Sequence, residues 1–269
     1  MSNSPDILAL DFDGVICDGL LEYFASTKRA YQQIWSQDVD DRLAPSFYRL
    51  RPVIETGWEM PILLRALALD ITESEILTDF GAIAHRIVES DGLEPKALAQ
   101  QLDGARDSWI QDDLENWLKL HRVYPGVVER LQQLIQTGIT IYIVTTKEGR
   151  FANRLLQEQG VNLPSSQIIG KESKRPKYET LRILRDRHQQ SATELSLFFV
   201  EDRLKALQQV AQQSDLDFVQ LFLADWGYNL ESDRALAAQD RRINLLSLEQ
   251  FPQDFNIWQQ DSSTMNNEQ

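Results

Sequence analysis

Two aspartates separated by one residue follow the first apolar run of the chain. Asp11 and Asp13 come directly after residues 7–10, so an extended backbone directs both side chains to the same side. Two close carboxylates repel each other, which favours a bound cation or a split in their pKa values. One carboxylate can attack a phosphoryl group while the other protonates the leaving oxygen and later activates water. The pair predicts phosphoryl transfer, with a solvated turn as the alternative because Asp is common in turns.

A second acidic pair ends another apolar run. Glu201 and Asp202 directly follow residues 197–200. Unpaired charges at the end of a buried strand are costly, so packing alone explains this pair poorly. Mg²⁺ prefers oxygen ligands and commonly takes only a few carboxylates. We therefore expect Mg²⁺ as a cofactor, with this pair close to it.

A threonine and two lysines are candidates for holding a phosphate. Thr145 ends the apolar run 139–144, and offers a hydroxyl and backbone donors beside the N-terminus of the next predicted helix. Lys177 precedes another predicted helix, where its charge would offset that of the nucleophile and of the transferring phosphoryl group. Lys174 could act in the same way. The alternatives are strand packing for the threonine and solvated surface positions for the lysines.

The elements that must position these residues alternate along most of the chain. Apolar runs predict buried strands at residues 7–11, 139–144, 167–170, 197–200 and 218–223. Helical periodicity predicts helices at residues 127–136, 150–159, 178–188 and 204–213. This alternation predicts an α/β fold with a doubly wound parallel sheet, which binds ligands at the carboxyl ends of its strands. The candidate residues stand at such ends, as does Asp225.

The stretch from residue 20 to residue 121 breaks this alternation and reads as all-helical. An insert of this length between the first two strands predicts a helical cap domain over a core made of residues 1–19 and 122–251. Residues 252–269 are rich in Gln, Asn, Asp and Ser, and we expect a partly disordered C-terminal tail there. Within the insert, residues 51–59 are a candidate substrate-contacting loop, the alternative being a helix boundary with Trp58 packed inside the cap.

Together these residues resemble the motifs of the haloacid dehalogenase superfamily, most of whose members are phosphatases. Residues 8–16 (LALDFDGVI) look like its first motif, residues 143–147 (IVTTK) like its second and residues 199–202 (FVED) like its fourth. Lys177 falls where the lysine of the third motif is expected. The resemblance covers essentially the whole core, and implies a Rossmann-like core with Asp11 as nucleophile.

The resemblance also implies roles for the other residues. Asp13 would be the acid and base, and Thr145 and Lys177 would contact phosphate, with Thr146 and Lys174 as further substrate-binding candidates. Mg²⁺ would be held by Asp11, the backbone carbonyl of Asp13, and Asp202, with Glu201 close by. The helical insert is similar to the cap of the phosphoglycolate phosphatase and β-phosphoglucomutase branch. Residues 124–127 (YPGV) and 225–229 (DWGYN) also look like segments of that branch.

Three departures from the family pattern affect these assignments. Glu201 stands where the fourth motif often has Gly, and the acid expected four or five residues later is missing, so the second acid would be Glu201. Lys177 is followed by Tyr178 rather than by Pro, which leaves Lys174 and Lys177 both open as the motif lysine. Thr146 stands where similar phosphatases often have Asn or Ser.

These observations predict a Mg²⁺-dependent phosphatase that hydrolyses a small phosphorylated metabolite through an aspartyl-phosphate on Asp11. A phosphomutase of the same superfamily would keep every core residue named. A non-catalytic binding or regulatory protein on the same core is the alternative from another class. A dehalogenase is disfavoured, because Asp13 and the second acidic pair favour phosphoryl transfer over carbon–halogen cleavage.

Composition narrows the setting. A net charge of −14 over 269 residues argues against general binding to nucleic acid or to an anionic membrane surface. Cys17 is the only cysteine, which excludes an internal disulfide and fits a reducing compartment. No apolar run approaches the length of a membrane span, and no secretory signal is evident at the start. We expect a cytoplasmic protein, and the sequence does not indicate its oligomeric state.

Overall fold

The computed structural model describes residues 4–188 and 195–258. The chain divides into two compact units, of which the first comprises residues 1–18 and 123–269 and the second is Gly19–Arg122. None of the helices among the described residues combines the length and apolarity that crossing a bilayer requires.

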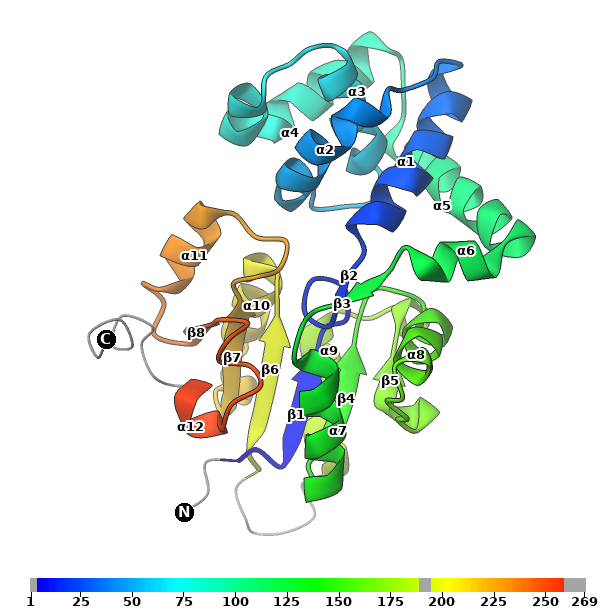
Figure 1. Cartoon of the computed structure of the whole chain (residues 1–269). Coiled ribbons are helices and arrows are strands. Elements are labelled where there is room, and N and C mark those ends of the chain that lie inside the picture. Colours follow the sequence, from blue (N-terminus) through cyan, green and yellow to red (C-terminus); the bar gives the residue numbers. More distant parts are fainter. Residues whose placement is uncertain (1–3, 189–194, 259–269) are drawn as a thin grey trace, which may run out of the picture. The chain divides into compact units, whose positions relative to one another are not determined.

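The first unit is built on a six-stranded parallel sheet (Figure 1). Its strand order is β5-β4-β1-β6-β7-β8. The strands are β1 (Ile7–Leu10), β4 (Thr140–Val144), β5 (Ile168–Ile169), β6 (Leu197–Glu201), β7 (Val219–Ala224) and β8 (Ile243–Leu246). Ile7 lies opposite Thr140 of β4 on one side and Leu197 of β6 on the other. The chain order reverses around β1, so the carboxyl ends of β1, β4 and β6 meet where such sheets bind ligands.

Helices cover both faces of this sheet, which confirms the predicted doubly wound α/β fold (Figure 1). They are α7 (Val127–Thr137), α8 (Gly149–Glu158), α9 (Lys177–His188), α10 (Leu204–Ala211), α11 (Glu231–Ala237) and α12 (Phe255–Trp258). Two short strands, β2 (Cys17–Asp18) and β3 (Arg122–Val123), form a separate two-stranded sheet. Because both faces are covered, all four residues of β1 are buried, as is typical of a central parallel strand.

Successive residues of a strand point to opposite faces, so each face has its own core. Ile7 and Ala9 of β1 belong to one apolar cluster with residues of α9 and α10, including Leu181 and Leu207. Aromatic rings fill the other face. The ring of Phe198 lies 5.2 Å from that of Phe222 and 5.6 Å from that of Phe255.

The end of the described chain belongs to this second core. The sequence placed residues 252–269 in a tail, and residues 259–269 lie outside the described part. Before that point Phe255–Trp258 form α12, and Trp258 is fully buried. The ring of Trp258 stacks on that of Phe251 at a centroid distance of 5.2 Å. The fold therefore extends to Trp258.

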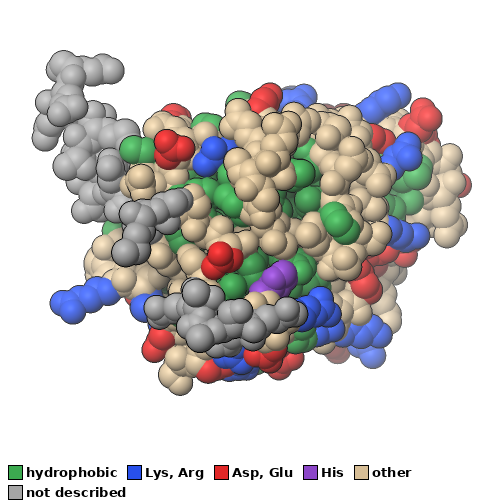
Figure 2. Space-filling view, turned by 90° about the horizontal axis from the view of Figure 1, so that it is seen from below, with side chains coloured by type: hydrophobic (Ala, Val, Ile, Leu, Met, Phe, Trp, Pro, Cys, Tyr) green, Lys and Arg blue, Asp and Glu red, His purple; other side chains and the backbone are tan. Residues whose placement is uncertain are grey.

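Figure 2 shows the molecule turned so that it is seen from below. Among the side chains drawn on this face, acidic and basic groups lie interspersed with hydrophobic ones.

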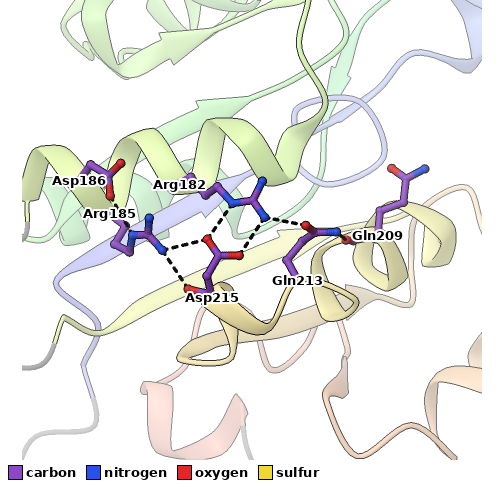
Figure 3. Close-up of polar contacts among 6 residues, drawn as sticks. All are labelled: Arg182, Arg185, Asp186, Gln209, Gln213 and Asp215. Atoms are coloured by element: carbon purple, nitrogen blue, oxygen red, sulfur yellow. Dashed lines mark hydrogen bonds and ion pairs between the residues drawn. The ribbon is translucent and has the colours of Figure 1, made fainter.

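One ion-pair network fixes the helix that begins at Lys177. Arg182 and Arg185 of α9 both reach Asp215, in the turn after α10 (Figure 3). Arg182 also donates to the side chain of Gln213. The hydrogen bond from Arg182, followed by that from Arg185, lowers the pKa of Asp215 well below its usual range. Because α9 carries Lys177 at its first residue, this network helps to define where that lysine lies.

The second unit is all-helical. Its helices are α1 (Leu20–Trp35), α2 (Ala44–Leu50), α3 (Glu59–Ala68), α4 (Glu73–Ser90), α5 (Pro95–Asp112) and α6 (Leu114–Lys119). The start of α4 shows why local sequence specifies these elements. Thr72 and Glu75 form a capping box there, which satisfies two backbone N–H groups that would otherwise lack partners.

A buried charge connects three helices of this unit. The Glu22 side chain on α1 is 0% exposed, and its Oε1 accepts hydrogen bonds from Arg106 Nε of α5 (2.7 Å) and Trp117 Nε1 of α6 (3.1 Å). Ser26, one turn along α1, donates to the same oxygen. Burial alone would lower the pKa of Arg106, but Glu22 raises it overall. The carboxylate therefore depends on these donors for its stability inside the unit.

We predict that Arg106→Met destabilises the protein by about 2–4 kcal/mol, because Glu22 then remains buried without its nearest cation. Urea unfolding followed by circular dichroism measures this loss. In the double variant Glu22→Gln with Arg106→Met, part of the stability should return, since the buried charge is removed as well. An Arg106→Met protein as stable as the wild type would show that the ion pair contributes nothing.

Candidate active site

The first loop, directly after β1, brings two acids to the carboxyl edge of the sheet. Asp11 N donates to Val200 O of β6 at 2.9 Å, which extends the pairing of β1 by one residue. The loop then closes tightly, because Gly14 N donates to Cys17 O at 2.8 Å. Gly14 has φ +85°, and a Cβ on it would lie only 2.1 Å from Asp202 Oδ2. Only glycine therefore lets this loop pass so close to Asp202.

A single lysine joins the two acidic strand ends. Lys177 Nζ lies 3.0 Å from Asp11 Oδ1 and 2.5 Å from Glu201 Oε2. The side chains of Lys177, Asp11 and Glu201 are 14%, 8% and 1% exposed. Lys174 instead is exposed, and its φ of 51° ends a turn of 3-10 helix. Of the two lysines that the sequence left open, the structure brings Lys177 to the acidic group.

Asp202 has one carboxylate oxygen that accepts no hydrogen bond from the described residues. Its Oδ2 accepts a hydrogen bond from Tyr228 N at 2.8 Å, whereas its buried Oδ1 has no hydrogen-bond partner among the described residues. Glu201 is more fully engaged, because Oε2 faces Lys177 and Oε1 accepts from Arg203 N at 3.0 Å. Carboxylate oxygens of Asp11, Glu201 and Asp202 all lie within 4.8 Å of one another. An all-oxygen donor set with an unpaired buried oxygen suits Mg²⁺.

Asp13 has a partner that the sequence did not single out. Lys147 Nζ lies 3.1 Å from Asp13 Oδ1, and the two side chains are 9% and 17% exposed. In the sequence, Lys147 appeared only as the last residue of the segment 143–147 (IVTTK). Its position two residues after Thr145 was the available signal, because the carboxyl ends of β1 and β4 are neighbours in the sheet.

Thr145 lies at the carboxyl end of β4 and is buried, as the strand pattern requires. Its backbone N–H donates to Ile169 O at 3.0 Å, and Lys147 N donates to Thr145 Oγ1 at 3.1 Å. The backbone N–H expected as a phosphate donor at Thr145 is thus engaged within the protein, because sheet pairing continues past β4. The Thr145 hydroxyl still has its own proton to donate. Thr146 is exposed.

Burial governs the electrostatics of the acidic group. It raises the pKa of Asp11 to about 7, although Lys177 opposes the shift. Burial likewise raises the pKa of Glu201 to about 7 and that of Asp202 to about 6. Burial alone would lower the pKa of Lys177, but Asp11 and Glu201 raise it overall. Three carboxyls therefore share one ammonium group, and a divalent cation would relieve their excess negative charge.

The structure also describes the remaining candidates, Asp225 and residues 51–59. Asp225 follows β7 and its N–H donates to Leu246 O of β8, and burial raises the pKa of its carboxyl. In the helical unit, Arg51–Val53 form a turn of 3-10 helix, and the side chain of Glu59 at the start of α3 accepts hydrogen bonds from the backbone N–H groups of Glu55 and Thr56. Trp58 is half-buried and stands at the start of α3.

Comparison with known proteins gives one family over most of the chain. The model of the haloacid dehalogenase-like hydrolases matches residues 5–205. A phosphoglycolate phosphatase of Vibrio vulnificus (strain CMCP6) is 26% identical over 192 residues, which cover 70% of this chain and 72% of that protein. A phosphoglycolate phosphatase of Vibrio cholerae is 24% identical over 195 residues, with 71% and 74% covered.

Solved structures share the fold. A crystal structure named as a predicted phosphoglycolate phosphatase from Haemophilus somnus superposes with a TM-score of 0.55 at 15% identity, covering 84% of this chain and 88% of that one. A predicted phosphatase from Clostridium acetobutylicum gives a TM-score of 0.54 at 11% identity, covering 91% and 95%. At these identities the likeness concerns the fold alone.

We predict that the metal-free protein loses stability as the pH rises. The pKa values of Asp11, Glu201 and Asp202 lie above those of an unfolded chain, so the native state holds protons that the unfolded state releases. Their stabilising contribution is complete below about pH 4 and is lost as the pH rises through about 7.

Melting temperatures in EDTA at about pH 5 and pH 8 measure this loss. Asp202→Asn should raise the melting temperature of the metal-free protein at the higher pH and change it little at the lower one. The same variant should lose the stabilisation that Mg²⁺ gives to the wild type. If the melting temperatures of the wild type and of Asp202→Asn depended on pH in the same way in EDTA, the buried Asp202 carboxyl would not have the raised pKa described above.

Proposed function

The chain belongs to the haloacid dehalogenase-like hydrolase family, and within it we propose a Mg²⁺-dependent phosphatase that forms an aspartyl-phosphate on Asp11. The observation that carries this proposal is the contact of Lys177 with Asp11, in the same acidic group as Asp202 Oδ1, for which the described part of the chain provides no hydrogen-bond partner. A buried nucleophile next to one fixed cation and one open acidic oxygen suits an anionic electrophile that arrives with a metal ion.

In the proposed first step, a carboxylate oxygen of Asp11 attacks phosphorus in line with the leaving oxygen. The bond between phosphorus and that oxygen breaks, and Asp13 gives its proton to the departing alkoxide. Lys177 is placed to offset negative charge on Asp11 and on the transferring group. In the second step, Asp13 takes a proton from water, which attacks phosphorus, releases phosphate and restores the Asp11 carboxylate.

Asp11, Asp202 and the backbone carbonyl of Asp13 would hold the metal, and the bound ion would neutralise charge on the phosphoryl oxygens. Glu201 would act mainly through Lys177, since both of its oxygens already accept hydrogen bonds. Thr145 would donate its hydroxyl to the phosphate. We assign the phosphate contacts to Thr145 and Lys177 rather than to Thr146 and Lys174, because the latter two are exposed.

Phosphoglycolate is the first substrate to test, because the Vibrio relatives are named phosphoglycolate phosphatases. We assign the helical unit the role of a cap, which would exclude bulk water during the reaction and contribute to specificity through residues such as those of the loop 51–59. We place the enzyme in the cytoplasm, which the buried thiol of Cys17 supports because it suits a reducing compartment.

We predict that Asp11→Asn lowers phosphate release by at least about a thousandfold, because the amide cannot form the acyl phosphate. The assay measures phosphate from phosphoglycolate and a panel of other phosphorylated metabolites, with Mg²⁺ or with EDTA. Asp225→Asn is the matched control, since the same change at another strand end lies outside the acidic group. Substantial turnover by Asp11→Asn would refute the covalent step.

A further inference from the structure

The turn after β7 holds Asp202 at two points. Tyr228 N donates to Asp202 Oδ2 at 2.8 Å, and Asn229 Nδ2 donates to the backbone carbonyl of Asp202 at 3.1 Å. Tyr228 and Asn229 are each 5% exposed. Arg203, the residue after Asp202, returns a hydrogen bond to the backbone carbonyl of Tyr228. The side chain and the backbone of one acidic residue are thus held by two consecutive residues of a distant loop.

The backbone of this turn packs directly against Asp202. A Cβ on Gly227 would lie 2.3 Å from Asp202 Cβ and 2.5 Å from Gly14 O. Trp226 Nε1, one residue earlier, donates to Val15 O of the first loop at 3.2 Å. No methyl group fits between these segments, so Asp202 is enclosed by the first loop and by the turn.

Asn229 fixes this turn through every polar atom of its side chain. Nδ2 also donates to Ala224 O at the end of β7, at 2.8 Å. Oδ1 accepts from Arg234 Nη1 at 2.9 Å, and the same guanidinium donates to Asn229 O at 3.1 Å. The two backbone carbonyls can only accept, so they face the amide nitrogen, whereas Arg234 can only donate and faces the amide oxygen. These partners determine the orientation of the Asn229 amide. An aspartate at this position would direct an oxygen at two carbonyl oxygens.

These contacts leave Asp202 with one unused acceptor. Oδ2 and the backbone carbonyl are engaged by the turn, and the buried Oδ1 remains without a hydrogen-bond partner among the described residues. A carboxylate held in this way cannot rotate without breaking the bond to Tyr228. The geometry therefore determines which oxygen faces the acidic group.

We propose that Asn229 is a positioning residue for divalent-cation binding, which fixes the turn Trp226–Tyr228 so that Asp202 presents Oδ1 to the ion. The inference rests on the proposed function, because the cation is the one proposed there. Partners that orient a metal ligand typically change metal affinity ten- to a hundredfold, roughly, when removed. Asn229 should therefore act on Mg²⁺ affinity rather than on the chemical step.

The test compares Asn229→Ala with Asn244→Ala in the full chain. Asn244 of β8 donates through Nδ2 to Leu221 O of β7 at 3.2 Å, so it makes the same kind of bond to the same strand without touching Asp202. Isothermal titration with MgCl₂ gives the dissociation constant of each protein. We expect Asn229→Ala to bind Mg²⁺ about tenfold or more weakly than the wild type, and Asn244→Ala to match it.

Kinetics separate positioning from general damage. With Asn229→Ala, the Mg²⁺ concentration for half-maximal activity should rise while kcat at saturating Mg²⁺ stays close to that of the wild type. Asn229→Asp should weaken Mg²⁺ binding in the same way, because it keeps the size of the side chain but loses the donor. A fall in kcat at unchanged Mg²⁺ affinity would contradict the proposal.

The outcomes distinguish failure of the proposed metal site from failure of the role proposed for Asn229. A wild-type protein that binds no Mg²⁺ would overturn the proposed metal site, and the inference with it. A wild type that binds Mg²⁺, together with an Asn229→Ala protein that binds it equally well, would overturn the inference alone. If Asn229→Ala fails to fold, Arg234→Met serves as the second variant. Arg234 is half-buried, and its loss removes the hydrogen bond that holds the Asn229 side-chain oxygen. An unchanged Mg²⁺ affinity in that variant would also overturn the inference.

Discussion

Three carboxyl groups and one ammonium group share a buried space at the carboxyl edge of the sheet. Asp11, Glu201 and Asp202 lie within 4.8 Å of one another, and Lys177 contacts two of them. Removing charges from water is expensive, and a single lysine cannot compensate three acids. Burial raises the pKa values of all three acids, and the divalent cation proposed here would offset their negative charge. The rest of the core can be understood as the framework that maintains this costly arrangement.

The fold provides that framework by bringing together segments that are far apart in the sequence. The acids come from the ends of β1 and β6, which are neighbours in the sheet. Lys177 begins α9, and Arg182 and Arg185 further along this helix bind Asp215. Gly14 gives the first loop its close approach to Asp202. These contacts join residues far apart in the sequence, so they depend on the strand order.

Much of this could be predicted from the sequence, because the strongest signals were apolar runs that end in acids. Such a run indicates a buried strand, and a parallel sheet then places the ends of β1, β4 and β6 together. The sixth strand, β8 (Ile243–Leu246), was missed because it has only four residues and polar Asn244 interrupts its apolar run. The helix α12 was missed because the polar composition of the tail outweighed Phe255 and Trp258.

Other features could not be read from spacing. Lys174 and Lys177 lie three residues apart, and a left-handed turn at Lys174 places only the second beside Asp11. The pairing of Lys147 with Asp13 requires knowledge of how two loops meet. Asn229 contacts the backbone carbonyl of Asp202, 27 residues earlier in the chain. Residue types do not indicate where a backbone carbonyl will lie, so this contact could not be predicted from the sequence.

The central claim is that Asp11 becomes covalently phosphorylated during turnover. Rapid acid quenching of the working enzyme, followed by peptide mapping by mass spectrometry, tests this claim most directly. We predict an acid-stable, base-labile phosphoryl group on the peptide that contains Asp11, which appears only when substrate and Mg²⁺ are both present. The contradicting result is rapid turnover without phosphate on the Asp11 peptide after acid quenching, which preserves an acyl phosphate. Asp11 would then not be the covalent nucleophile.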